Sequence, residues 1–288
     1  MIHPQRVDYI RGLAETVAEE HSTPQGTNLD AILEEHSIDM VCDDFPEAFD
    51  GLLIKDGRGF RVVCNLTTGN APRSSRGRFT IAHELGHYFL DEHRSVLSEQ
   101  LMPSLGERAI QDNLMEREAD LFASHLLLPG KVVQKACKGR KGLEGIRQMA
   151  SKYQVSMKCS AIRYVGEDIV PCCLTFRDWE KKLRWKWFSR KAWLAGIRKV
   201  KETLIPKCAS DQILSKGPNT EGEIADSACL ANYVFQMGDG LNYNEVFREE
   251  AMALGEYGVL TLLTAQKPEL PAVVDALDRT FSRTGLRA

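Results

Sequence analysis

The segment His83-Glu84-Leu85-Gly86-His87 carries the residue types and the spacing of a metal-assisted hydrolase. Residues four apart share one face of an α-helix, so His83 and His87 can present their imidazoles to one ion. Glu84 lies about 100° round the helix and can reach a metal-bound water without binding the metal itself. The motif predicts a zinc site in which Glu84 is the general base of peptide hydrolysis.

The residues around this motif distinguish between two interpretations: a metal site, or a surface helix that carries two histidines by chance. The flanking residues are largely apolar: Phe79, Ile81, Ala82, Leu85, Tyr88, Phe89 and Leu90. A helix that is apolar on nearly every side is expected to be buried, and buried His and Glu side chains need partners. The context therefore favours a metal site over the surface-helix alternative.

A catalytic zinc ion normally has three protein ligands and one open position for water. The candidates for the third ligand are Glu92, His93, Glu116, Glu118 and His125. Glu116, Ala119, Asp120 and Ala123 fall on one helical stripe, where the two alanines would let another backbone approach closely. We expect Glu116 to be the third ligand and Asp120 to bond the outer nitrogen of a ligating histidine. His125 is expected to be structural.

The ligand types favour Zn²⁺ but would also accept Mn²⁺ or Fe²⁺. An extended substrate would need an open strand edge, and the expected strand Phe60–Leu66 is one candidate platform. The alternative is that this strand is fully paired within its own domain.

The elements that position the site follow from the hydrophobic pattern. Helices are expected at about 7–20, from Asn28 as N-cap, at about 78–91 and at about 107–128. The strands 51–54 and 60–66 are expected to form a hairpin across 56–59. Further along, we expect two short helices in 142–164, strands at 169–175 and 183–187, and a helix at 244–254 before the apolar run 258–263.

The chain of 288 residues is long enough for more than one domain. The predicted class is α+β, with a metallopeptidase domain at 1–130, a helix-turn-helix-like segment at 131–165 and an α+β domain at 166–288. No stretch approaches the ~20 apolar residues that cross a bilayer, and the N-terminus lacks an apolar signal core. We therefore expect a cytoplasmic protein with no membrane partner. The eight cysteines form no C-x-x-C pair, and most of them are expected to be reduced and buried.

Clusters of basic residues support two nucleic-acid alternatives. Nine Lys or Arg and one acid lie between Lys131 and Arg163, as a DNA-binding regulator with a structural zinc site would require. The stretch Arg177–Lys201 interleaves basic residues with tryptophans, as some single-strand binders do. However, Leu183, Trp185 and Trp187 alternate like the core face of a strand, which is the favoured interpretation.

Three stretches carry a resemblance to a known family. The segment 78–87, with the sequence RFTIAHELGH, is followed by 116–123, EREADLFA, and by 126–129, LLLP. Together they closely resemble the paired motifs of the ImmA/IrrE metallopeptidases, over roughly residues 7–165. In that family the first Glu of the second motif is the third zinc ligand, and the matching residue is Glu116.

This resemblance implies a zincin-like endopeptidase that cleaves a helix-turn-helix (XRE-type) repressor and so derepresses stress-response or mobile-element genes. It also implies a helix-turn-helix-like segment and a GAF-like C-terminal domain, which would act as a sensor. The substrate thus comes from the resemblance, whereas the residue spacing supplies the metal site.

Overall fold

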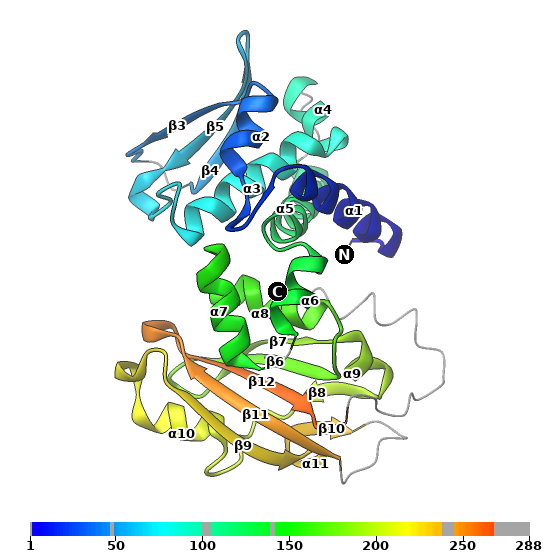
Figure 1. The fold of residues 1–288 in the computed structure, drawn as a ribbon, viewed down its shortest axis with the longest axis vertical. Helices are drawn as coiled ribbons and strands as arrows, with labels where there is room; N and C mark the ends of the chain where they lie inside the picture. The colour runs from blue at the N-terminus through cyan, green and yellow to red at the C-terminus, as the bar shows by residue number, and fades with distance from the viewer. Residues whose placement is uncertain (1, 47–48, 100–104, 139–141, 238–244, 268–288) are drawn as a thin grey trace. The chain divides into compact units, whose positions relative to one another are not determined.

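The computed structural model describes residues 2–46, 49–99, 105–138, 142–237 and 245–267 (Figure 1). The chain divides into two compact units, which are described one by one. The N-terminal unit comprises Met1–Val133 with Met149–Ser160, and the C-terminal unit comprises Gln134–Gln148 with Ala161–Ala288. Three helices contribute residues to both units: α6 (Gly130–Cys137), α7 (Leu143–Tyr153) and α8 (Met157–Gly166). The division into three domains stays a prediction.

The N-terminal unit is built mainly from helices and one small sheet. Its helices are α1 (Pro4–Glu20), α2 (Leu29–Glu35), α3 (Ser75–Phe89), α4 (Asp91–Glu99) and α5 (Leu105–Leu127). The predicted cap of α2 is confirmed, because the Asn28 side chain accepts a hydrogen bond from the backbone N–H of Ala31. The side chain of Ser74 caps α3 in the same way through the N–H of Gly77.

The sheet of this unit contains three strands in the order β3-β5-β4. They are β3 (Asp39–Asp43), β4 (Gly51–Asp56) and β5 (Gly59–Asn65), besides a two-residue pair of β1 (Ser22–Thr23) and β2 (Gly26–Thr27). The hairpin of β4 and β5 is confirmed. The strand β3 was not predicted; it pairs with β5 in parallel. Because β5 has a neighbour on each side, the alternative of a fully paired strand holds for this segment, and β3 and β4 are the edge strands of the sheet.

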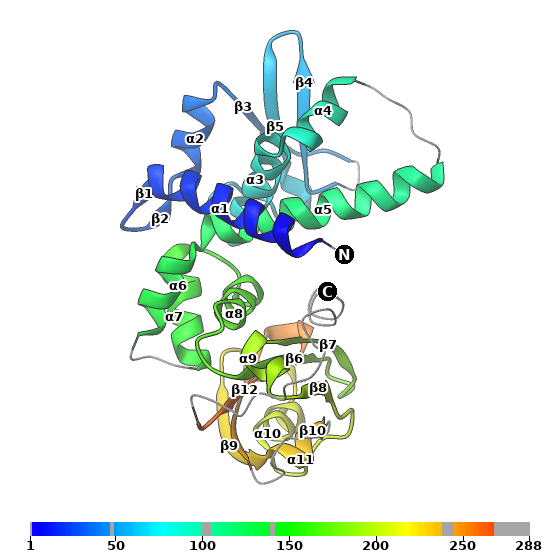
Figure 2. The ribbon, with the colours of Figure 1, turned by 90° about the vertical axis from the view of Figure 1, so that its right-hand side faces the viewer.

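The helices α3 and α5 of this unit cross each other (Figures 1 and 2). A Cβ atom added at Gly86 in α3 would lie 3.0 Å from the Cα of Ala119 in α5. Ala119 and Phe122 are fully buried at this crossing, and Phe122 stacks on Phe89 of α3 with 5.6 Å between ring centroids. The small residues therefore set the distance between the two helices.

The C-terminal unit contains a five-stranded antiparallel sheet in the order β7-β6-β12-β11-β9. Its strands are β6 (Cys172–Arg177), β7 (Leu183–Phe188), β9 (Ile224–Leu230), β11 (Val246–Ala253) and β12 (Val259–Ala265). The remaining elements are α9 (Arg190–Leu194), β8 (Ile197–Val200), α10 (Ala209–Lys216), α11 (Ala231–Val234) and β10 (Phe235–Met237), which pairs with β8. The predicted strands at 169–175 and 183–187 correspond to β6 and β7.

The prediction of a helix at 244–254 is wrong, since the described part of this segment forms the strand β11. Its Glu, Ala and Met residues favour a helix in isolation. In the structure β11 lies between β9 and β12, and this pairing overrides the local preference. The buried Glu249 is satisfied by the hydroxyls of Ser210 and Ser227. Polar partners from other elements thus let Glu249 occupy an interior strand of the sheet.

The aromatic residues of the basic stretch 177–201 are packed against other side chains. Trp185 stacks on Phe176 with 5.5 Å between ring centroids, and Trp193 is 3% exposed. Leu183, Trp185 and Trp187 are only partly buried, whereas the neighbouring Phe188 is buried, so a core face made of these three residues stays a prediction. The eight cysteines form no disulfide, and six of them are buried, which agrees with the expectation for most of them. Within the described part of the chain, no helix combines the length and apolar character that crossing a membrane demands.

Candidate metal centre

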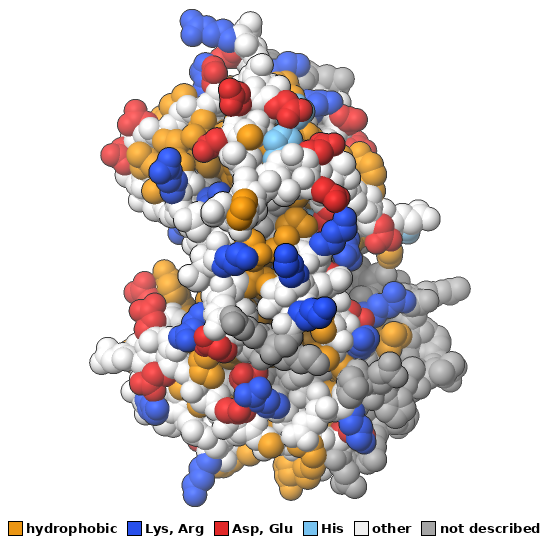
Figure 3. Space-filling model, viewed as in Figure 1, with side chains coloured by type: hydrophobic (Ala, Val, Ile, Leu, Met, Phe, Trp, Pro, Cys, Tyr) orange, Lys and Arg blue, Asp and Glu red, His pale blue; other side chains and the backbone are white. Residues whose placement is uncertain are grey.

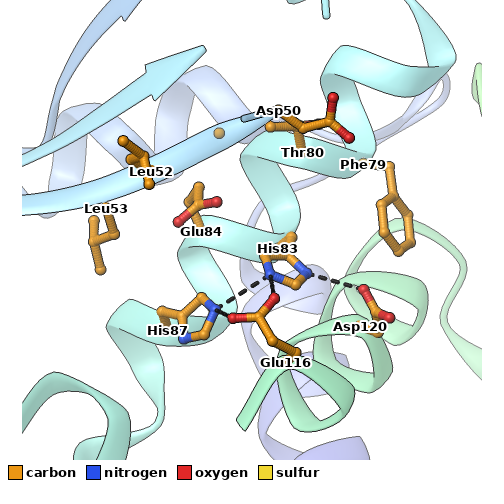
Figure 4. A pocket seen from close by; sticks show the side chains of 11 residues that line it. Asp50, Leu52, Leu53, Phe79, Thr80, His83, Glu84, His87, Glu116 and Asp120 are labelled. Atoms are coloured by element: carbon orange, nitrogen blue, oxygen red, sulfur yellow. Dashed lines mark hydrogen bonds and ion pairs between the residues drawn. The ribbon is translucent and has the colours of Figure 1, made fainter. Parts of the chain in front are cut away.

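Two helices supply the polar residues of the site (Figure 4). His83, Glu84 and His87 lie on α3, and Glu116 and Asp120 lie on α5. The i, i+4 spacing places both histidines on the side of α3 that faces Glu116. The tight α3–α5 crossing then brings the carboxylate between the two rings. The structure therefore unites the residues that the sequence selected from two separate segments.

The donor atoms of His83, His87 and Glu116 converge within 4.8 Å of one another. The two Nε2 atoms lie 3.2 Å apart, and Glu116 places Oε2 3.1 Å from Nε2 of His83 and Oε1 3.4 Å from Nε2 of His87. Two imidazole nitrogens and a carboxylate are a donor set that suits a catalytic zinc ion. The group can hold one divalent cation.

Electrostatics in this cluster favour a positive charge among the ligands. Burial opposes protonation of His83, but hydrogen bonds with Asp120 and Glu116 outweigh it and raise the pKa of His83 to about 10. The hydrogen bonds from His83 and His87 lower the pKa of Glu116 well below its usual range. A divalent cation would take the place of the proton that these carboxylates attract.

Glu84 lies beside His83, His87 and Glu116 but faces the strand β4, so its carboxylate is not one of the converging donor groups. Its side chain is only 6% exposed, and burial is the main cause that raises its pKa. The backbone N–H of Leu53 in β4 donates a hydrogen bond to its carboxylate and partly opposes this shift. A carboxylate with a raised pKa beside a metal site is suited to accept a proton and to return it later.

A pocket of about 400 Å³ opens at this cluster. Its walls come from α3, α5 and the start of β4: Asp50, Gly51, Leu52, Leu53, Phe79, Thr80, His83, Glu84, His87, Glu116 and Asp120. Gly51 permits the close approach of β4, because a Cβ atom there would overlap Cγ2 of Thr80 and lie 3.0 Å from Oε1 of Glu84. The sequence argument missed Gly51, since only the packed structure shows its contact with α3.

The outer nitrogens of the two histidines have different partners. Oδ1 of Asp120 lies 2.9 Å from Nδ1 of His83, the position expected for a carboxylate that bonds an outer nitrogen. Nδ1 of His87 instead lies 3.2 Å from Nδ1 of His93, which is 1% exposed. Burial, with the neighbouring His87, lowers the pKa of His93 to about 4. No signal in the sequence placed the ring of His93 behind His87.

The other candidates for the third ligand lie away from the convergence point. Glu118 contacts Nε2 of His93 at 3.2 Å, and Glu92 pairs with Arg6 at 3.0 Å. His125 is 5% exposed and its Nδ1 lies 3.1 Å from Oε1 of Glu15, which agrees with the structural role expected for it.

Comparison with known proteins supports this site. Residues 69–164 match the family model Peptidase_M78, described as an IrrE N-terminal-like domain. No curated protein matches the chain. Among solved structures, the chain is similar to a Mycobacterium tuberculosis transcriptional regulator, with 14% sequence identity and a TM-score of 0.56. That alignment covers 91% of this chain and 77% of the other, and at this identity it concerns the fold alone.

Proposed function

We propose that this chain, whose residues 69–164 form an ImmA/IrrE-type metallopeptidase domain, is a zinc-dependent endopeptidase that cleaves a partner transcriptional repressor. The observation that carries the proposal is the convergence of His83, His87 and Glu116 beside the buried carboxylate of Glu84. Cleavage of a repressor in the cytoplasm would derepress the genes that it silences, such as stress-response or mobile-element genes. The choice of a helix-turn-helix (XRE-type) repressor rests on the family resemblance.

Each residue of the site has its own role in the proposed hydrolysis. A zinc ion held by His83, His87 and Glu116 would lower the pKa of a water molecule and polarise the scissile carbonyl. Glu84 accepts a proton from the attacking water and delivers it to the leaving amine. Asp120 accepts the Nδ1 proton of His83, which leaves Nε2 of that ring available as a ligand. Mn²⁺ or Fe²⁺ would satisfy the same donors.

The edge strand β4 is the proposed platform for an extended substrate. The backbone N–H of Asn65 bonds the carbonyl of Asp50, so the alternating ladder turns the backbone groups of Gly51 and Leu53 away from β5. These two residues line the pocket, and a substrate strand can pair with the backbone groups of Gly51 and the carbonyl of Leu53, since the N–H of Leu53 already donates to Glu84. Leu52 and Ile54 are 44% and 40% exposed, and hydrophobic side chains gather over this sheet in Figure 3. They offer apolar contacts to the same substrate.

A second network holds this edge in place. The side chain of Asn70 donates to the carbonyl and to Oδ1 of Asp50, and its own oxygen accepts from the hydroxyl of Thr80. Arg76 pairs with the carboxylate of Asp50 at 3.0 Å. These contacts fix the start of β4 against α3, which supports a strand platform beside Glu84.

The test is incubation of the full chain and Zn²⁺ with a helix-turn-helix repressor encoded in a neighbouring gene. We expect one or a few discrete fragments, which a chelator prevents. The Glu84→Gln variant is the matched control, because it keeps the three ligands. Cleavage that proceeds equally with this variant or with the chelator would refute the proposal.

Three of the described basic residues on which the DNA-binding alternative depends are paired with carboxylates. Arg163 is 4% exposed and pairs with the buried Glu167 at 2.7 Å. Arg147 pairs with Glu144 at 2.6 Å, and Lys131 pairs with Glu19 at 3.0 Å. Arg140 and Lys141 lie outside the described residues. DNA binding and the GAF-like sensor stay predictions, the first of them testable by a duplex-DNA mobility shift at low salt.

A further inference from the structure

A chain of buried polar groups runs from the metal centre to the N-terminal helix. Nδ1 of His87 lies 3.2 Å from Nδ1 of His93, and Nε2 of His93 lies 3.2 Å from Oε2 of Glu118. Arg6 in the first turn of α1 donates to the same oxygen from Nε at 3.0 Å and from Nη2 at 2.7 Å. The side chains of His93 and Glu118 are 1% and 8% exposed. Three helices, α1, α4 and α5, therefore meet behind His87.

When Nε2 of His87 binds a cation, only one placement of protons gives every hydrogen bond in this series of side chains a donor and an acceptor. The neutral ring of His87 then carries its proton on Nδ1 and must donate it to an acceptor. Nδ1 of His93 is that acceptor, so the proton of His93 lies on Nε2. This Nε2–H donates to Glu118, a carboxylate that also accepts from Arg6. Each group thus has a defined role as donor or acceptor, and the hydrogen bonds are donated in one direction, from His87 to His93 and from His93 to Glu118.

We propose that His93 is a positioning residue of the metal centre, which with Glu118 and Arg6 holds His87 in the tautomer that offers Nε2 to the metal. The proposal rests on the proposed function only in taking His83, His87 and Glu116 as the ligands. It assigns His87 a partner of a different kind from that of His83. Asp120 beside His83 is 59% exposed, whereas His93 and Glu118 are shielded from water.

His93 is buried, so its orientation depends on the polar side chains that it contacts. An unpaired polar group in a dry interior is costly, so the orientation of His93 depends on Glu118 and Arg6 together. Arg6 also pairs with Glu92, which is 67% exposed and belongs to the first turn of α4. The bonds from Arg6 to Glu118, and not the exposed pair with Glu92, couple the docking of α1 to the position of His87 on α3.

The experiment measures Zn²⁺ affinity of the full chain by competition with a chelator, and the visible spectrum of the Co²⁺-loaded protein. His93→Leu fills the space but removes the acceptor. We expect a loss of affinity of about 10- to 100-fold, the range for outer partners of metal ligands, with a changed Co²⁺ spectrum. His93→Asn places an oxygen near the position of Nδ1 and should restore most of the affinity.

Two matched controls separate positioning from packing. His125→Asn removes another buried histidine that faces a carboxylate, and Glu92→Gln removes the exposed partner of Arg6. Both should keep the affinity of the unaltered chain. Unchanged affinity in His93→Leu, or equal losses in His93→Leu and His93→Asn, would overturn the proposal.

A further variant covers the case in which His93→Leu does not fold. Glu118→Gln keeps the shape of the side chain but removes its charge, and should give a smaller loss in the same direction. Full affinity in this variant would overturn the proposed chain. Because the readout is metal affinity, a chain that binds Zn²⁺ yet cleaves no repressor would refute the proposed function and leave this inference standing.

Discussion

The backbone N–H of Leu53 donates a hydrogen bond to the carboxylate of Glu84, which joins the edge strand β4 to the metal-site helix α3. The same bond turns the carboxylate toward the pocket that β4 borders. A substrate paired with β4 would therefore lie beside the carboxylate that we propose as the general base. The position of the strand and the chemistry of the site are parts of one arrangement.

Glu84→Gln is expected to leave metal binding nearly unchanged and to slow repressor cleavage by about 10²- to 10⁴-fold, the usual contribution of a general acid–base. The amide has the size of the carboxylate but cannot accept the proton of water. Metal content by atomic absorption and the cleavage rate should be measured on the same sample. A variant that loses both metal and activity would show that Glu84 binds the ion.

Glu116→Ala is expected to lower Zn²⁺ affinity by more than about 100-fold, beyond the range for outer partners of a ligand. The change removes the carboxylate that lies 3.1 Å from His83 and 3.4 Å from His87. Arg117→Ala, at the next position of α5, serves as the control. Full zinc occupancy in the Glu116 variant would place the third ligand elsewhere.

Gly51→Ala is expected to slow cleavage and to lower the free energy of unfolding by about 1–3 kcal/mol, as overpacking commonly does. The added methyl group would overlap Thr80 and press on the carboxylate of Glu84. Gly57→Ala, in the turn of the same hairpin, meets nothing within 4 Å and should have little effect. Equal behaviour of the two variants would show that β4 can move away from α3 without cost.

The pair of Glu15 and His125 predicts a dependence of stability on pH. Burial alone would raise the pKa of Glu15, but hydrogen bonds from His125 and from the N–H of Gly130 lower it to about 2. A depressed carboxyl pKa stabilises the fold above the unfolded value of about 4.5, and this contribution fades as the pH falls toward 2. Glu15→Gln should therefore reduce the free energy of unfolding at pH 6 by on the order of 2 kcal/mol.

Urea unfolding of the metal-free protein, followed by far-ultraviolet circular dichroism, checks this prediction. The difference between Glu15→Gln and the unaltered chain should shrink as the pH is lowered from 6 to 3. Glu19→Gln, which loses only an exposed pair with Lys131, should change little at any pH. A difference that stays constant with pH would contradict the assignment.

The sequence predicted correctly those helices, caps and turns that are specified by residues close together along the chain. The helix with His83 and His87 did so because helical periodicity and the i, i+4 spacing depend only on neighbouring residues. The cap at Asn28 and the hairpin of β4 and β5 have similarly local causes. The chemistry of the site was therefore open to prediction from residue types.

Contacts between distant segments were decided only in the tertiary structure. The parallel pairing of β3 with β5 decided between an open and a fully paired strand, and pairing on both sides made β11 a strand despite its helix-forming residues. The approach of Gly51 to Thr80 and the position of His93 behind His87 also depend on how helices and strands pack. Sequence periodicity records which face of an element is apolar, but not which element will cover it. For this protein, the sequence alone determined a helix whose two histidines can hold a metal ion, and packing determined the residues that surround them and the strand beside them.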